Sequence, residues 1–195
     1  MTDAAASVRN DSIKWTSHAL VEKWSGEQVA EVIARTGVQN PSGSLLASYL
    51  APAEIAEASG NLLTTAGLTR LASLLVAGGG QALTNTATRL GVGDSTTAAA
   101  IGDTDLGAAA GSTHRFFMTM DATYPSVSAG VLTAKATFGA SDGNFAWQEW
   151  GLDVGTPTVT SGTTVNATFF NHKIASLGTK VSPAVWALTV TVTIS

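Results

Sequence analysis

Acid–base catalysis is the first chemistry that the residue types suggest, and Glu149 is the residue best suited to it. Its carboxylate lies in a strongly apolar stretch, between Trp147 and Trp150. Alternation of side chains along a strand would place Glu149 on the same face as Trp147, where burial would raise its pKa as a catalytic acid requires. Glycoside hydrolysis also needs a second, opposed carboxylate. The sequence therefore favours a buried structural acid that pairs with Arg89 or Lys173.

The histidines and aspartates do not have a metal-binding spacing. The three histidines are far apart, and none belongs to a close histidine pair; they are His18, His114 and His172. Asp94, Asp103 and Asp105 share one loop, but without the spacing of an EF-hand. The chain has no cysteine, which excludes thiolate metal sites and thiol chemistry. We therefore expect no metal and no cofactor.

A short glycine motif, Gly91-Val-Gly-Asp-Ser95, has elements of two enzyme signatures. It lacks the lysine that a phosphate-binding loop needs. As a Gly-Asp-Ser esterase motif it would need a histidine three residues after an aspartate, and no histidine in the chain has that neighbour. A turn after a strand is the simpler interpretation. We expect no catalytic residue and no enzymatic activity.

Three aromatic side chains near predicted loops are candidates for sugar contacts, namely Trp147, Trp150 and Tyr124. Most of the aromatic residues fall on strand-period faces, which favours packing in a core. A carbohydrate-binding or receptor-binding module is therefore the second alternative for the function.

The composition is that of a charge-poor globular protein. Charged residues make up 12% of the 195 residues, which is roughly half the usual share. The net charge of −4 is not the basic footprint of a nucleic-acid-binding protein. The most apolar segment, residues 62–77, is shorter than a membrane span and carries Arg70. We expect neither a nucleic acid nor a membrane as a partner.

Residues 1–59 have the charge density and the capping signals of short helices. Ser25 and Gln28 have the spacing of a capping box, apolar residues on one helical face follow, and Gly37 provides a stop. Another short helix is expected to open at residues 52–55, after a proline. We interpret residues 1–59 as a helical arm that anchors the chain.

Residues 60–195 change from helical to strand periodicity. A helix is predicted over residues 65–77, and short segments of period two follow it, separated by clusters of glycine, serine, aspartate and proline. The predicted strands cover residues 86–92, 115–120, 132–138, 145–154, 165–174 and 186–195. The expected fold is mainly β with an α-helical N-terminal segment. Its C-terminal domain is expected to be an antiparallel β-sandwich of jelly-roll-like type.

An ordered set of short motifs in residues 60–195 resembles a group of virion proteins of tailed bacteriophages. The motifs are Gly60-Asn-Leu-Leu63, Gly67-Leu-Thr-Arg-Leu71, Arg89-Leu-Gly-Val-Gly-Asp-Ser-Thr-Thr-Ala98, Met120-Asp-Ala-Thr-Tyr-Pro125, Asn144-Phe-Ala-Trp-Gln-Glu-Trp-Gly151, Asn171-His-Lys173, Leu177-Gly-Thr-Lys180 and Val190-Thr-Val-Thr-Ile194. The resemblance implies a structural, non-enzymatic and usually homo-oligomeric protein. It transfers no catalytic residue.

The resemblance implies a location in the virion, after synthesis in the cytoplasm of the bacterial host. We expect a surface-exposed minor tail or fibre protein, with capsid decoration as the alternative. The expected partners are further copies of the chain, in a homotrimer or another homo-oligomer, and the tail or major capsid proteins. A charge-poor surface suits such repeated contacts, because few charges have to be desolvated.

Overall fold

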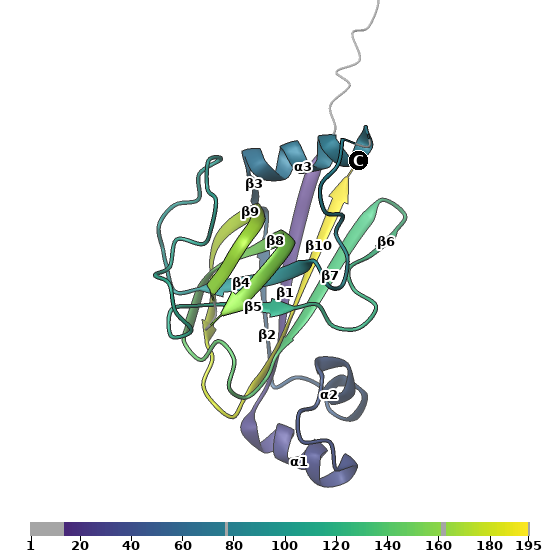
Figure 1. The fold of residues 1–195 in the computed structure, drawn as a ribbon. Helices are drawn as coiled ribbons and strands as arrows, with labels where there is room; N and C mark the ends of the chain where they lie inside the picture. The colour runs from purple at the N-terminus through teal and green to yellow at the C-terminus, as the bar shows by residue number, and fades with distance from the viewer. Residues whose placement is uncertain (1–13, 77, 161–162, 195) are drawn as a thin grey trace, which may run out of the picture.

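The computed structural model describes residues 14–76, 78–160 and 163–194, and for residues 156–160 and 163–167 it describes the backbone alone. Within these ranges the chain is mainly β, with two five-stranded antiparallel sheets and three short helices. The arrangement is consistent with a β-sandwich (Figure 1).

The two sheets each combine strands from distant parts of the sequence. The first sheet has the order β2-β1-β10-β7-β6. Its strands are β1 (Trp15–Trp24), β2 (Glu54–Ser59), β6 (Ser126–Ser128), β7 (Val131–Phe138) and β10 (Val185–Ile194). The second sheet has the order β3-β9-β8-β4-β5. Its strands are β3 (Leu62–Leu63), β4 (Thr88–Gly93), β5 (Arg115–Thr119), β8 (Ala146–Thr160) and β9 (Thr163–Thr179).

The main hydrophobic core lies between the two sheets. Leu188, Val190 and Val192 of β10 are buried in the same cluster as Leu90 and Val92 of β4. The predicted alternation in the last strand is confirmed, because its leucine and valines face this core. Burial of large apolar side chains such as these contributes about 1.5–3 kcal/mol each to folding.

A bulge in the pairing of β8 with β9 lies where β8 changes which side chains face the core. Trp147 pairs with Gly178 and Glu149 pairs with Ile174, so two positions on β8 oppose four positions on β9, and an irregularity of this kind breaks the regular alternation. Trp147 and Trp150 are therefore both fully buried in the main core. Glu149 points to the opposite, outer face of the second sheet. The prediction that Glu149 shares a face with Trp147 is wrong, because simple alternation ignores the bulge.

Strands β1 and β2 correct the interpretation of residues 1–59 as a helical arm. β1 pairs along its whole length with β10, and β2 pairs with the other edge of β1. Two stretches of this segment, β1 and β2, therefore belong to the same sheet as the C-terminal strand. The helix predicted at residues 52–55 is wrong, because Glu54–Ser59 is an edge strand. Residues 1–13 of the predicted arm lie outside the described residues.

Helices α1 (Gly26–Thr36) and α2 (Gly43–Tyr49) pack at one end of the first sheet (Figure 1). The predicted capping box is present: the Ser25 side chain accepts from the Gln28 N–H, and the Gln28 side chain accepts from the Ser25 N–H. Gly37 ends α1 in the left-handed region, at φ 75°. The two helices share a small apolar cluster with the outer face of β10.

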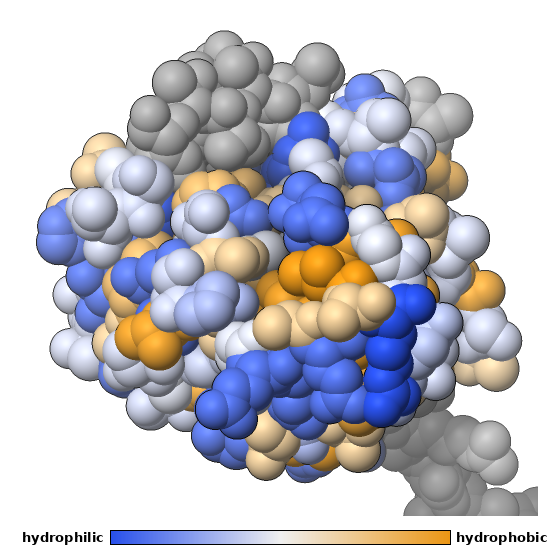
Figure 2. All heavy atoms as spheres, turned by 90° about the horizontal axis from the view of Figure 1, so that it is seen from below, coloured by the Kyte–Doolittle hydropathy of each residue, from blue (hydrophilic) through white to orange (hydrophobic). Residues whose placement is uncertain are grey.

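Helix α3 (Thr65–Leu75) lies at the opposite end of the molecule from α1 and α2 (Figure 1). It coincides with the helix predicted over residues 65–77, except that its last turn ends earlier. None of the described helices is long and apolar enough to cross a membrane. Figure 2, which views the α1–α2 end of the molecule, shows apolar residues gathered between hydrophilic ones on this face.

Candidate functional site

The outer face of the second sheet is shaped by glycines. Three of them leave space for a side chain that packs directly over the strand. A Cβ on Gly93 would lie 2.2 Å from Glu149 Oε1, and a Cβ on Gly91 would lie 2.4 Å from the Phe117 ring. Gly151 makes the same room for the Phe169 ring. The glycines at positions 91 and 93 therefore accommodate neighbouring side chains on this face.

The loop of residues 94–114 lies over this outer face and is fixed there in two ways. Leu106 from the loop is buried with Phe117 and Phe169 in a separate apolar cluster. The backbone N–H groups of Gly107 and Ala108 donate to the two carboxylate oxygens of Glu149, each at 2.8 Å. Glu149 thus serves as the acceptor that holds the loop onto the sheet.

His172 lies between two carboxylates. Its Nε2 is 2.7 Å from Glu149 Oε2, and its Nδ1 is 2.6 Å from Asp103 Oδ2. The His172 side chain is 2% exposed and the Glu149 side chain is 0% exposed. A ring that donates from both nitrogens is an imidazolium, so the placement of His172 between Asp103 and Glu149 suits the protonated form of its ring.

The pKa values of this cluster follow from its geometry. Burial opposes the charged form of His172, but the hydrogen bonds and charges of Glu149 and Asp103 outweigh it and raise the pKa of His172. Burial also opposes ionisation of Asp103, but the Ala100 N–H and His172 outweigh it and lower the pKa of Asp103. The arrangement therefore favours the charged forms of His172 and Asp103.

The predicted partners of Glu149 are replaced by His172. Arg89 Nη1 donates to the backbone oxygens of Thr86 and Thr88, each at 2.9 Å, and the guanidinium is attracted to Asp153. Among the described residues no ion pair joins Lys173 to Glu149. The buried acid was expected, but its partner was not.

The three aspartates of the loop contact three different basic side chains. Asp94 lies 2.7 Å from His114 Nδ1, Asp105 lies 2.8 Å from Arg115 Nη1, and Asp103 bonds to His172. In the described part of the chain no group of three or more acidic or histidine side chains is arranged to hold a metal ion. The aspartates serve to fix the loop in place.

The ionisable groups of the cluster are bonded to one another and to the surrounding backbone. A general base needs a free ring nitrogen next to its reacting group, but both nitrogens of His172 are bonded to carboxylates. Both oxygens of Glu149 are likewise occupied by backbone N–H groups. The Asp103–His172–Glu149 cluster therefore joins β8, β9 and the loop of residues 94–114.

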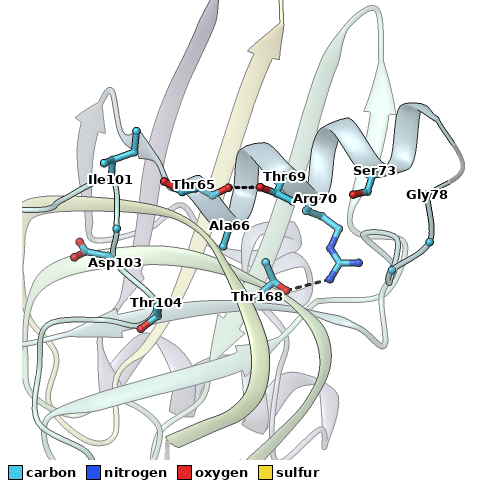
Figure 3. Close-up of a pocket in the computed structure, with 13 residues that line it drawn as sticks. Thr65, Ala66, Thr69, Arg70, Ser73, Gly78, Ile101, Asp103, Thr104 and Thr168 are labelled. Carbon is cyan, nitrogen blue, oxygen red and sulfur yellow. Dashed lines mark hydrogen bonds between the residues drawn. The ribbon is translucent and has the colours of Figure 1, made fainter.

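A groove of about 610 Å³ lies beside α3 and reaches Asp103 (Figure 3). Its two charged lining residues are bonded within the protein. Arg70 Nη2 donates to Thr168 Oγ1 at 3.1 Å, as Figure 3 shows, and Asp103 accepts from His172. The groove thus separates the helix from the loop that the cluster fixes.

Two of the three aromatic candidates for sugar contacts are buried. Trp147 and Trp150 are each 0% exposed, because both side chains face the core at the irregular pairing of β8 with β9. Trp147 and Trp150 therefore cannot contact a glycan, which corrects their prediction as sugar contacts. Tyr124 packs against the same core but is only partly buried.

Lys180 is a second buried ionisable group. Its Nζ donates to the Gly139 carbonyl at 2.7 Å and to Asn144 Oδ1 at 2.8 Å. Burial lowers the pKa of Lys180 to about 8, against the opposing attraction of Asp142. Lys180 therefore bonds to two residues of the turn between β7 and β8.

Sequence reasoning missed the connection between Asp103 and His172, which are 69 positions apart. The available signal was indirect, namely an acidic loop and a histidine within the strand predicted over residues 165–174.

No protein-family model matches the chain, and no match is found among curated proteins or solved structures.

Proposed function

We propose that the protein is a non-enzymatic structural component of a tailed-bacteriophage virion, of the minor tail or fibre type. The observation that carries the proposal is the set of exposed apolar side chains on a charge-poor surface. Leu75 is 86% exposed and Val76 is 78% exposed. Exposed apolar patches on a soluble domain mark interaction surfaces, so such a surface suits packing against copies of the chain and against other virion proteins.

The buried ionisable cluster supports a structural role. His172 and Glu149 are bonded to each other and to the surrounding chain, and their exposure to solvent is 2% or less. An enzyme site of this type would need a reacting atom within reach of a free acid or base. The same groups here fix a long loop on a sheet.

The finer description of the fold belongs to the proposal as well. A jelly-roll-like sandwich is supported by two pairings between early and late strands, β1 with β10 and β3 with β9. We assign the contact with the particle to the end that carries α1 and α2, where apolar residues gather on the surface (Figure 2). Capsid decoration is the alternative location, with the same non-enzymatic role.

Particle composition tests the proposal. Purified particles of the phage that encodes the chain are analysed by mass spectrometry, and gold-labelled antibody against the chain is located by electron microscopy. Label on the tail is the expected result, and label on the head selects capsid decoration. Absence of the chain from washed particles overturns the proposal.

The contact at α1 and α2 has its own test. Deleting residues 1–59 would remove β1 from the middle of a sheet and unfold the protein, so surface substitutions are preferable. Tyr49→Glu introduces a charge at a 44% exposed position on α2, and reduced incorporation into particles is expected. Val127→Glu, at a 73% exposed position on β6, is the control. Equal incorporation of the two variants overturns this assignment.

A further inference from the structure

Helix α3 carries an apolar stripe on its solvent side. Leu68, Ala72 and Leu75 are spaced at i, i+4 and i+7, which places them within about 60° of the helix circumference. Leu68 is 47% exposed, Leu75 is 86% exposed, and Ala72 is also exposed. The solvent side of a surface helix is normally polar or charged, so this stripe is unusual.

The opposite side of α3 is already packed. A Cβ on Gly67 would lie 2.1 Å from the Phe170 carbonyl oxygen, so the helix backbone contacts β9 directly. Thr64 caps the helix and also donates to β9, and Arg70 bonds to Thr168. The helix is thus fixed by its other face, and the stripe remains uncovered.

The region around the stripe is almost free of charge. Residues 58–88 contain one charged side chain, Arg70, and it points into the groove beside the helix (Figure 3). In a two-fold contact between two identical surfaces, a residue at the axis meets its own copy, so a charge there would meet a like charge. A neutral apolar surface meets no such penalty, which favours a second copy of the chain as the occupant.

The place of α3 in the fold fits this occupant. The helix lies at one end of the sandwich, opposite α1 and α2 (Figure 1). Two copies can therefore bring their α3 ends together while the α1–α2 ends face away from each other. The end proposed to contact the particle stays free.

We propose that α3 of one copy packs against α3 of a second copy across a two-fold axis, through Leu68, Ala72 and Leu75. The proposal deepens the proposed function and rests on it, since it names the surface through which the chain self-associates. An i, i+4, i+7 stripe is the spacing by which one helix buries its apolar face against another. Ala72 lies at the middle of the stripe, nearest the axis.

Opposite charges at Ala72 test the contact. The variants Ala72→Glu and Ala72→Lys are studied separately and as an equimolar mixture, by size-exclusion chromatography with light scattering. Circular dichroism checks that each variant is folded. Each single variant is expected to lose self-association at least tenfold, because like charges meet at the axis, and the mixture is expected to recover it. Val127→Glu, at a 73% exposed position on β6, is the control and should behave as the wild type.

A crosslink provides an independent readout. The chain has no cysteine, so Ala72→Cys supplies a single thiol for a short bis-maleimide reagent. Covalent dimers are expected with Ala72→Cys and not with Val127→Cys. Unchanged self-association of the charged variants, no recovery in their mixture, or no covalent dimer overturns the α3 contact while self-association itself still stands. A wild-type chain that stays monomeric overturns both proposals.

Discussion

Glu149 and His172 are hydrogen-bonded across neighbouring strands on the outer face of the second sheet, with His172 Nε2 2.7 Å from Glu149 Oε2. Asp103 bonds to the other ring nitrogen, and the loop of residues 94–114 donates two backbone N–H groups to Glu149. The hydrogen bonds within the cluster stabilise these buried charges in place of the water that would otherwise solvate them. Its contribution to stability can be measured.

Removing the cation from the cluster should destabilise the fold. His172→Gln leaves Glu149 and Asp103 without their shared positive partner, and Glu149 stays buried. We expect the free energy of unfolding to fall by about 1–3 kcal/mol, measured by urea denaturation. His18→Gln is the control, because His18 lies at the surface, 3.3 Å from Glu57, and should change stability by less than about 0.5 kcal/mol. Equal losses in the two variants would contradict a structural role for His172.

The stability of the protein should depend on pH through the same cluster. The raised pKa of His172 adds stability below the ordinary histidine pKa, and this stability is lost as the pH rises through the folded-state pKa. The lowered pKa of Asp103 adds stability above the ordinary aspartate pKa, and this stability is lost as the pH falls through the folded-state value. The contribution of the cluster should therefore be greatest between about pH 4 and 6.5.

Urea denaturation of the wild type and His172→Gln across pH isolates this contribution. The difference between the two stability curves should be largest inside that window and shrink on the alkaline side. A difference that stays constant from pH 5 to well above pH 8 would show that the charge of His172 does not matter.

The glycine under Glu149 should not tolerate a side chain. A Cβ at position 93 would lie 2.2 Å from Glu149 Oε1 and 2.9 Å from the Ala108 Cβ. Gly93→Ala should therefore displace the carboxylate and the loop, at a cost of about 1–3 kcal/mol. Gly102→Ala is the matched control, since a Cβ there meets no atom within 4 Å. Similar stabilities of the two variants in urea would argue against the tight packing of Glu149.

Lys180 should make the stability of the protein rise with alkaline pH, which is the opposite of the effect of His172. Its pKa is lowered from 10.5 to about 8 by burial, so the unfolded chain binds more protons between these values. Stability therefore rises with pH across this window. Lys180→Met should remove that rise, measured as the slope of unfolding free energy against pH. The exposed substitution Lys14→Met should retain it, and a wild-type slope in Lys180→Met would contradict burial of the charged group.

The predictions from sequence succeeded where one local pattern determines the structure. The alternation in Val185–Ile194 reflects a strand with one face on the core, and the Ser25–Gln28 spacing gave the start of α1. Glu54–Ser59 was taken for a helix because a proline precedes it and because it is charged. As an edge strand it pairs on one side only, and its charges remain in water.

The candidate site was only partly predictable. The sequence around Glu149 indicated a buried acid, but an irregularity in the pairing of β8 with β9 decides which face it occupies. The contact of Asp103 with His172 depends on how a long loop folds back onto a sheet, and no periodicity in the sequence encodes it. The helix that carries the exposed stripe was predicted over residues 65–77, but the exposure of its apolar side chains was not.

Self-association of the intact chain tests the central claim most directly. The measurement is the molar mass of the wild-type protein by light scattering during size-exclusion chromatography, over at least a hundredfold range of concentration. A mass of two or more chains that persists on dilution is the predicted result. A mass of one chain at every concentration would contradict the assignment of this protein as an assembling structural component.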